Sequence, residues 1–162
     1  MGRVRTATIN DLEDIVEIYN WAILNTVATF DTEIKTVETQ KEWFSQHDSQ
    51  FPIVVYEREG QIKGWASLSR WSDRCAYSKT AEISVYIEPA SHREGLGSHL
   101  FEWLIDSARG NGLRSILSRI AGPSEASLKL HDKFQFELVG TMKQVGDKFG
   151  RVLDVHLLQL IL

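Results

Sequence analysis

A short glycine-rich turn is the part of the sequence best suited to chemistry. It reads Arg93-Glu94-Gly95-Leu96-Gly97-Ser98 and lies between the strand-like run Ile83–Ile87 and an amphipathic helix. Small residues let the backbone approach a ligand closely, and the free N–H groups and the dipole of the following helix attract an anion. The turn therefore predicts a phosphate-binding site.

Other motifs for phosphate binding, covalent catalysis or metal binding are incomplete. The turn does not complete a G-x-G-x-x-G pattern, no Gly-Lys-Ser/Thr follows it, and the chain has no G-x-S-x-G. The five histidines are scattered without metal-ligand spacing, and Cys75 is the only cysteine. We therefore expect no metal, no Rossmann or P-loop chemistry, and no covalent intermediate.

The hydrophobic periodicity predicts the elements that position this turn. Asn10 and Glu13 suggest a capping box for the first helix, and a turn is expected at Gly146–Gly150. The order of elements indicates a single domain over residues 1–162 of the α/β (α+β) class. The strands are expected at Arg3–Thr8, Ile53–Glu57, Ile62–Ser69, Thr80–Ile87, Ser115–Ile120, Glu137–Val145 and Arg151–Leu162, and the helices around Leu12–Ile23, Thr36–His47, Leu100–Ala108 and Ser124–Phe134.

The strand run, the turn and its helix together resemble the acetyl-CoA site of the GNAT N-acetyltransferase superfamily. That resemblance implies the GNAT fold, one mixed, mostly antiparallel twisted sheet of about seven strands flanked by about four helices. Within the superfamily, the chain is most similar to phosphinothricin and methionine sulfoximine acetyltransferases. The shared motifs span nearly the whole chain and are Phe30-x-Thr32-Glu33, Trp71-x-x-Arg74-x-Ala76-Tyr77, Thr80-Ala81-Glu82, Leu130-His131 and Val145-Gly146-x-Lys148-x-Gly150-Arg151.

The resemblance implies a binding mode for acetyl-CoA as cosubstrate. The backbone amides of Arg93, Glu94, Gly95, Leu96, Gly97 and Ser98 would hold the pyrophosphate. Val85, Tyr86 and Ile87 would pair with the pantetheine arm as an added strand does. Ser124, where the superfamily usually has Asn, is a further candidate contact, and Val152 stands where the subgroup commonly has Trp.

Amide formation from a thioester needs a neutral amine, so a general base is useful near neutral pH. By resemblance, Glu82 is that base and acts through a water molecule. His131 stands where the superfamily often has the Tyr that protonates the leaving thiolate, and histidine can do so because it titrates near 6.5. Their other interpretations are a cross-strand ion pair for Glu82 and helix packing for His131.

An acceptor pocket for a small amino acid analogue is expected from Phe30, Trp71, Arg74 and Tyr77. A guanidinium binds a carboxylate with two parallel hydrogen bonds, so Arg74 is the expected carboxylate anchor. The predicted reaction is acetyl transfer from acetyl-CoA to an amine of the phosphinothricin, methionine sulfoximine or methionine sulfone type, with a role in detoxification or resistance.

The amino-acid composition limits the classes of molecule that the protein is expected to bind. The 162 residues carry a formal net charge of −4, without the basic excess of a nucleic-acid or anionic-membrane binder. No apolar run approaches the roughly 20 residues that cross a bilayer, and no secretory signal is evident. We expect a cytoplasmic protein with no nucleic-acid or membrane partner, and the resemblance implies a homodimer.

Two other functions remain open at this point. The chain could acetylate another small amine or a protein N-terminus. It could also be a non-catalytic module that binds acyl-CoA, although mere binding requires neither Glu82 nor His131.

Overall fold

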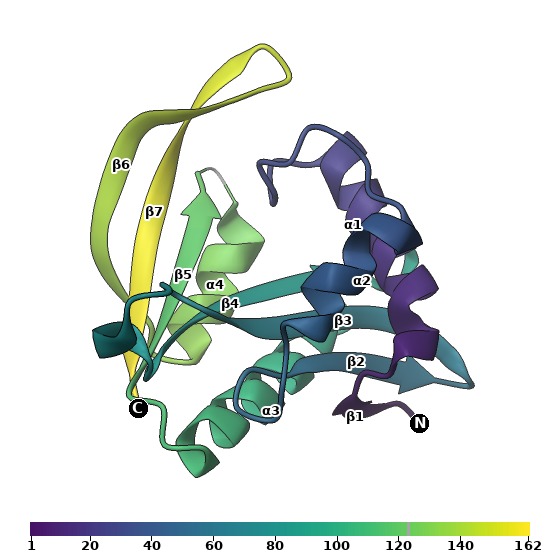
Figure 1. Cartoon of the computed structure of the whole chain (residues 1–162). Helices are drawn as coiled ribbons and strands as arrows, with labels where there is room; N and C mark the ends of the chain where they lie inside the picture. The colour runs from purple at the N-terminus through teal and green to yellow at the C-terminus, as the bar shows by residue number, and fades with distance from the viewer. Residues whose placement is uncertain (123) are drawn as a thin grey trace.

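One seven-stranded sheet with helices on both faces makes up the computed structural model, which describes residues 1–122 and 124–162 (Figure 1). The sheet order is β1-β2-β3-β4-β5-β7-β6, and every neighbouring pair is antiparallel except β4 and β5. The predicted fold class is thereby confirmed. The strands are β1 Arg3–Thr6, β2 Ile53–Arg58, β3 Gln61–Arg70, β4 Thr80–Ile87, β5 Ser115–Ala121, β6 Glu137–Lys148 and β7 Arg151–Ile161; the helices are α1 Leu12–Asn25, α2 Val37–Ser45, α3 Leu96–Gly110 and α4 Glu125–Lys133, with 3-10 turns at Ile9–Asp11, Cys75–Tyr77 and Pro89–Ser91.

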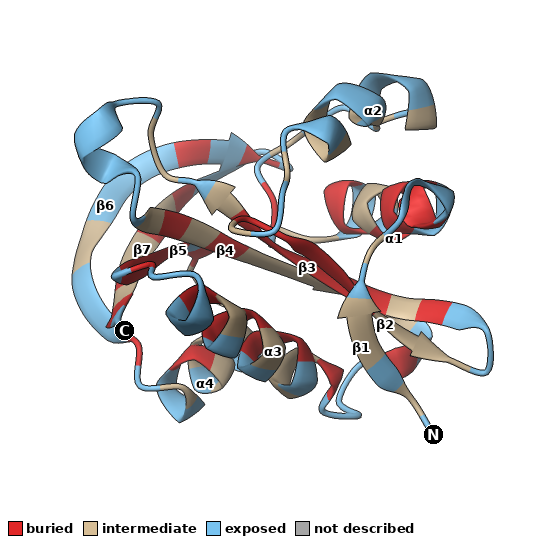
Figure 2. Cartoon of the chain, turned by 60° about the horizontal axis from the view of Figure 1, so that its bottom comes forward, coloured by how far each residue is buried: buried red, intermediate tan, exposed pale blue. Residues whose placement is uncertain are grey.

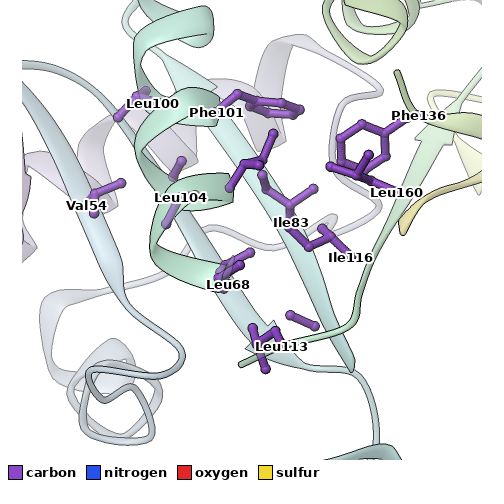
Figure 3. Packing of buried hydrophobic residues seen from close by; sticks show 14 of the residues in the cluster. Val54, Leu68, Ile83, Leu100, Phe101, Leu104, Leu113, Ile116, Phe136 and Leu160 are labelled. Atoms are coloured by element: carbon purple, nitrogen blue, oxygen red, sulfur yellow. The ribbon is translucent and has the colours of Figure 1, made fainter. Parts of the chain in front are cut away.

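Two hydrophobic layers hold the helices to the sheet. Figure 2 shows α1 and α2 over one face and α3 and α4 over the other. The alternation of side chains along a strand makes this possible: on β3, Ala66 and Leu68 pack toward α3, whereas Trp65 belongs to the layer under α1. The apolar stripe of α3 meets the larger layer, where Leu100, Phe101 and Leu104 are fully buried against the strands (Figure 3).

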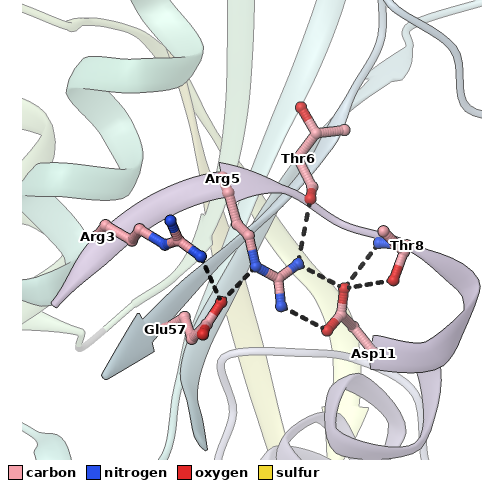
Figure 4. Close-up of polar contacts among 6 residues, drawn as sticks. All are labelled: Arg3, Arg5, Thr6, Thr8, Asp11 and Glu57. Carbon is pink, nitrogen blue, oxygen red and sulfur yellow. Dashed lines mark hydrogen bonds and ion pairs between the residues drawn. The ribbon is translucent and has the colours of Figure 1, made fainter. Parts of the chain in front are cut away.

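The first helix begins with a different cap from the one that the sequence suggested. Asp11, rather than Glu13, accepts hydrogen bonds from the backbone N–H of Thr8 at 2.7 Å and from its hydroxyl at 3.1 Å. Arg5 on β1 donates two hydrogen bonds of 2.8 Å to the same carboxylate and a third, of 2.5 Å, to Glu57 (Figure 4). The ion pair across β1 therefore selects the earlier cap, and a 3-10 turn precedes α1.

The last hairpin is longer than expected. The predicted turn at Gly146–Gly150 is wrong in extent: β6 continues to Lys148, and only Phe149 and Gly150 form the turn. Both turn residues have positive φ, 54° and 68°, the geometry of a two-residue hairpin turn that matches the twist of the strands. The pairing of β6 with β7 also contains two register shifts, between Leu138 and Gly140 and between Met142 and Gly146.

The parallel pair β4 and β5 separates after three residue pairs. Thr80, Ala81 and Glu82 pair with Ser115, Ile116 and Leu117, and the pairing stops there. Beyond this point β4 still pairs with β3 and β5 still pairs with β7. The two strands consequently present unpaired edges to each other in the middle of the sheet.

Candidate active site

A cavity of about 640 Å³ lies where β4 and β5 separate. It runs between the two strand edges and is bordered by α4, by the loop between α1 and α2, and by the β6–β7 hairpin. The lining residues are Tyr19, Val27, Ala28, Thr29, Phe30, Asp31, Ser69, Glu82, Ile83, Ser84, Val85, Tyr86, Phe101, Ser118, Arg119, Ile120, Ala121, Ser124, Ser127, His131, Met142, Val145 and Val155.

The edge of β4 offers backbone groups to this cavity. Val85 and Tyr86 line it, as does Ser124 at the start of α4. Ile87 is not among the lining residues, and its carbonyl accepts a hydrogen bond of 2.9 Å from Nε2 of His92. An extended ligand arm can therefore pair with β4 along Val85 and Tyr86 as an additional strand would.

The glycine-rich turn forms the N-terminus of α3, as expected. Arg93 and Gly95 both adopt positive φ, 68° and 83°, so the chain reverses sharply just before the helix. A Cβ on Gly97 would lie 3.1 Å from Cδ2 of Leu130, so this glycine lets α3 approach α4 closely. The first turn of a helix has free N–H groups and the positive end of the dipole, which suits a phosphate.

The side chains of the turn contact their surroundings rather than the cavity. Glu94 pairs with Arg58 at 2.6 Å, Ser98 accepts a hydrogen bond from Lys133 at 3.0 Å, and Leu96 is buried in the core. No residue of Arg93–Ser98 lines the cavity, so a phosphate bound by the backbone of the turn would lie beyond the cavity lining.

Glu82 lies on the cavity wall at the point where the strands separate. Its carboxylate receives two hydrogen bonds from Arg119 on β5, one from Nε at 2.7 Å and one from Nη2 at 2.8 Å. The pKa of Arg119 is raised, chiefly by this hydrogen bonding. The Glu82 side chain is 19% exposed and that of Arg119 is 54% exposed. The predicted base is thus held in an ion pair across the gap, and both partners face the cavity.

His131 lies on α4 and is buried, yet it borders the cavity. Its Nδ1 lies 2.7 Å from the carbonyl of Ser127, and because a carbonyl only accepts, Nδ1 carries the hydrogen. Its Nε2 lies 2.7 Å from the hydroxyl of Ser118 on β5. Burial lowers the pKa of His131. The ring is therefore neutral near pH 7, and its Nε2 accepts the hydroxyl hydrogen of Ser118.

The opposite wall of the cavity comes from the loop between α1 and α2. Phe30 on this loop packs so closely on β6 that a Cβ at Gly146 would lie 2.5 Å from its ring. The buried Lys148 donates a hydrogen bond of 2.7 Å to the carbonyl of Thr29, and desolvation lowers the pKa of its amine. The hairpin thus fixes the loop that carries Phe30 across the cavity.

A pair of tyrosines continues this wall into the sheet. The rings of Tyr19 and Tyr86 are 5.0 Å apart, and the Tyr19 hydroxyl donates to Asp31 at 2.5 Å. Burial raises the pKa of Tyr86 to about 12 and raises that of Tyr19 further. Both phenols are therefore neutral hydrogen-bonding groups near pH 7.

The remaining predicted acceptor residues lie outside the cavity lining. Trp71, Arg74 and Tyr77 belong to the segment between β3 and β4 and do not line the cavity, and Arg74 is exposed. Trp71 nevertheless comes near it, because the guanidinium of Arg119 lies 5.8 Å from its ring.

Among the residues of this site that were not predicted from the sequence are Ser118, Arg119 and Lys148. Arg119 is the single charged residue of β5, and a lone charge on a strand is a usable signal for a cross-strand ion pair. Lys148 stood within a recognised motif but received no role. Nothing in the sequence marked Ser118, whose importance depends on the packing of α4 against β5.

Within residues 1–122 and 124–162, no three histidine, cysteine or acidic side chains are grouped as metal ligands would be. In the same part of the chain, none of the helices is long and apolar enough to cross a bilayer.

Comparison with known proteins gives a consistent result. Residues 4–157 match the family model of the acetyltransferase (GNAT) domain. The chain is 36% identical to an L-methionine sulfoximine/L-methionine sulfone acetyltransferase of Salmonella typhimurium over 158 residues, which cover 97% of this chain and 92% of the relative.

Solved structures of acetyltransferases are similar to this chain over nearly its whole length. A GNAT superfamily phosphinothricin acetyltransferase from Sinorhizobium meliloti, in complex with acetyl-CoA, has a TM-score of 0.94 and 33% identity, and covers 99% of this chain and 88% of the other. A ribosomal-protein-alanine N-acetyltransferase from Brucella melitensis has a TM-score of 0.94 and 36% identity, and covers 98% and 99%.

Proposed function

Because this chain belongs to the GNAT acetyltransferase family, we propose that it transfers the acetyl group of acetyl-CoA to the α-amino group of a small amino acid analogue. The acceptors that we propose are phosphinothricin, methionine sulfoximine and methionine sulfone, and the biological role is detoxification. The observation that carries this proposal is the cavity between β4 and β5, which places Glu82 beside an unpaired strand edge.

Acetyl-CoA would lie across this gap. The backbone of Arg93–Ser98 would bind the pyrophosphate at the N-terminus of α3, and Val85 and Tyr86 would pair with the pantetheine arm. Ser124 borders the same cavity and would add a contact. The thioester would then lie near Glu82, where β4 and β5 separate.

Glu82 would act as the general base through a water molecule. The free amine attacks the thioester carbonyl carbon, the nitrogen loses its proton to the base, and the carbon–sulfur bond breaks to release the CoA thiolate. A backbone N–H group of β4 near Tyr86, rather than near Ile87, which does not line the cavity, would bind the oxyanion of the tetrahedral intermediate.

His131 would serve the leaving thiolate together with Ser118. Because His131 is neutral with its hydrogen on Nδ1, it acts by holding the Ser118 hydroxyl at the cavity wall. That hydroxyl can rotate to hydrogen-bond the departing sulfur. Solvent then supplies the proton of the free thiol.

We also propose that the protein is a cytoplasmic homodimer. Its edge strand β6 has an unpaired side, and large apolar side chains are exposed along the β6–β7 hairpin. A second copy of the chain would cover this surface. The exposed residues are Leu138, Val139, Met142, Val145, Phe149, Val152 and Ile161.

A protein N-terminus is the second candidate acceptor, favoured by the likeness to the ribosomal-protein-alanine acetyltransferase. Against it, the loop that carries Phe30 lines the cavity and limits its width, which favours a compact acceptor over a peptide. A non-catalytic acyl-CoA-binding module would need no base at the cavity wall, and Glu82 would then serve only in the ion pair with Arg119.

The test is a thiol-release assay with acetyl-CoA. The acceptors are phosphinothricin, methionine sulfoximine, methionine sulfone, spermidine, an aminoglycoside and a serine-initiated peptide. We expect turnover with the amino acid analogues alone. Turnover with the peptide instead would favour a protein N-terminus as the acceptor. No turnover with any acceptor, despite tight binding of acetyl-CoA, would favour the non-catalytic binding module.

A further inference from the structure

We infer that the Glu82–Arg119 ion pair is the recognition site for a zwitterionic acceptor. The acceptor's ammonium group would bind Glu82, and its α-carboxylate would bind Arg119. This inference rests on the proposed function and deepens it, since it names the chemical class of acceptor and assigns the carboxylate to a residue of β5.

The charges around the cavity point to Arg119. Among the described residues that line it, Arg119 is the only lysine or arginine, and His131 is neutral. Arg74 is exposed and does not border the cavity. A carboxylate that enters this space therefore meets one permanent positive charge, and that charge is already bound to the proposed base.

The side chains of Glu82 and Arg119 differ in how freely they can move. Glu82 is 19% exposed and lies on the paired part of β4, whereas Arg119 is 54% exposed and lies where β5 has separated from β4. The long arginine side chain can therefore turn from Glu82 toward a ligand while Glu82 stays in place. The ring of Trp71, 5.8 Å from the guanidinium, offers a face along which it can move.

An α-amino acid matches this pair because it carries both charges on a single carbon. When it enters between the partners, each side chain exchanges one opposite charge for another, so no charge is left unpaired in the cavity. An amine without a carboxylate brings only a positive charge. It must compete with Arg119 for Glu82 and leaves the guanidinium without a partner.

The exchange also couples binding to chemistry. Before the acceptor binds, both oxygens of Glu82 accept hydrogen bonds from Arg119. Once the α-carboxylate binds the guanidinium, Glu82 is free to accept the proton of the ammonium group through a water molecule. The nitrogen is then the neutral nucleophile that the thioester requires.

The experiment compares L-methionine sulfone with its α-amide, which keeps the amine and side chain but lacks the negative charge. The value of kcat/KM is measured for both acceptors with the wild type and with Arg119→Gln, Arg119→Lys, Arg74→Gln and Arg109→Gln. Arg109 is an exposed arginine of α3 that pairs with Asp106, and its replacement controls for loss of a surface charge. The ratio of the two acceptors within one variant cancels general effects on folding or on Glu82.

We expect the wild type to prefer the free acid by about tenfold to a hundredfold, the range expected for a charge-assisted pair. Arg119→Gln should bring the ratio close to one, Arg119→Lys should keep part of the preference, and Arg109→Gln should match the wild type. Retention of the preference in Arg119→Gln, or its loss in Arg74→Gln alone, would overturn the inference.

A binding measurement separates this inference from the proposed function. If no variant acetylates either acceptor, the proposed function fails, and calorimetric titration of the acid and the amide into the CoA-saturated protein decides the inference. Tighter binding of the acid by the wild type, and not by Arg119→Gln, would still support the site. Equal binding of the two compounds, or binding of neither, would overturn it.

Discussion

Glu82 lies beside the separated strands, and both hydrogen bonds that its carboxylate accepts from the described residues come from Arg119. Glu82→Gln keeps the shape of the side chain and removes its basicity. We expect kcat to fall by about 10²-fold to 10⁴-fold, the usual contribution of a general base. The acetyl-CoA dissociation constant, measured by calorimetry, should not change.

Glu17→Gln on the exposed surface of α1 is the matched control and should retain wild-type kcat. Wild-type turnover in Glu82→Gln would contradict the assignment of the base and return Glu82 to a purely structural ion pair.

His131 yields a prediction about pH. Desolvation lowers its pKa below the ordinary value of 6.5, so the neutral ring prevails at pH 6.5 and above. Because the neutral ring only holds Ser118, we expect no decrease of kcat between pH 6.5 and 8 that depends on His131. The measurement is the pH profile of kcat at saturating acceptor for the wild type and His131→Gln. A decrease above pH 6.5 in the wild type that is absent from the variant would make His131 a proton donor.

At the scale of single residues, the sequence predicted which residues belong to the site better than it predicted what those residues contact. Glu82, His131 and Phe30 were predicted from motifs, and all three border the cavity. Their roles for acetyl transfer stay predictions. The pairing of Glu82 with Arg119 was not predictable, because it depends on how β4 and β5 align, and a single sequence does not state that register.

Among the elements, the β6–β7 hairpin supports the loop that carries Phe30. Gly146→Ala would place a methyl group 2.5 Å from the Phe30 ring, so the ring and its loop must move. We expect KM for the acceptor to increase by about threefold to tenfold, corresponding to a shift of roughly 1 kcal/mol in binding. Steady-state kinetics measure this, and the acetyl-CoA dissociation constant should not change.

Gly140→Ala is the matched control on the same strand, since a Cβ there would meet no atom within 4 Å. An unaltered acceptor KM in Gly146→Ala, or an equal increase in Gly140→Ala, would show that the hairpin does not position the acceptor wall.

Most elements could be predicted from periodicity, and the errors fall where tertiary contacts decide. The run Thr80–Ile87 became β4 with the expected bounds. The cap of α1 differs from the predicted one because Arg5 binds the carboxylate of Asp11. The last turn shrank to Phe149 and Gly150 because the two strands keep pairing beyond Gly146. The local sequence pattern carries no information about either of these tertiary contacts.

For the whole molecule, the exposed apolar residues of β6 and β7 predict self-association. Light scattering after size exclusion should give twice the mass of the 18.5 kDa chain. Val152→Lys places a charge on this surface at a residue that is 62% exposed, so we expect it to shift the population toward monomer without unfolding the protein. Gln61→Lys at the exposed start of β3 adds the same single charge away from this surface and controls for the change of net charge. A wild-type monomer at tens of micromolar would contradict the predicted dimer.

The order of elements and the family motifs were enough to predict the sheet and its helices as a whole. They could not predict the cavity, because the separation of β4 from β5 results from where hydrogen bonding stops, not from the composition of either strand. The separation of β4 from β5 opens the cavity of the candidate active site within the seven-stranded sheet.

A competition experiment decides whether the cavity selects a small amino acid analogue as the acetyl acceptor. Methionine sulfone, spermidine and a serine-initiated peptide are mixed in equal amounts with acetyl-CoA and the enzyme, and mass spectrometry identifies the acetylated compound. We predict acetyl transfer to the α-nitrogen of methionine sulfone, with none to the other two. Acetylation of the peptide or spermidine in its place would contradict the proposed function.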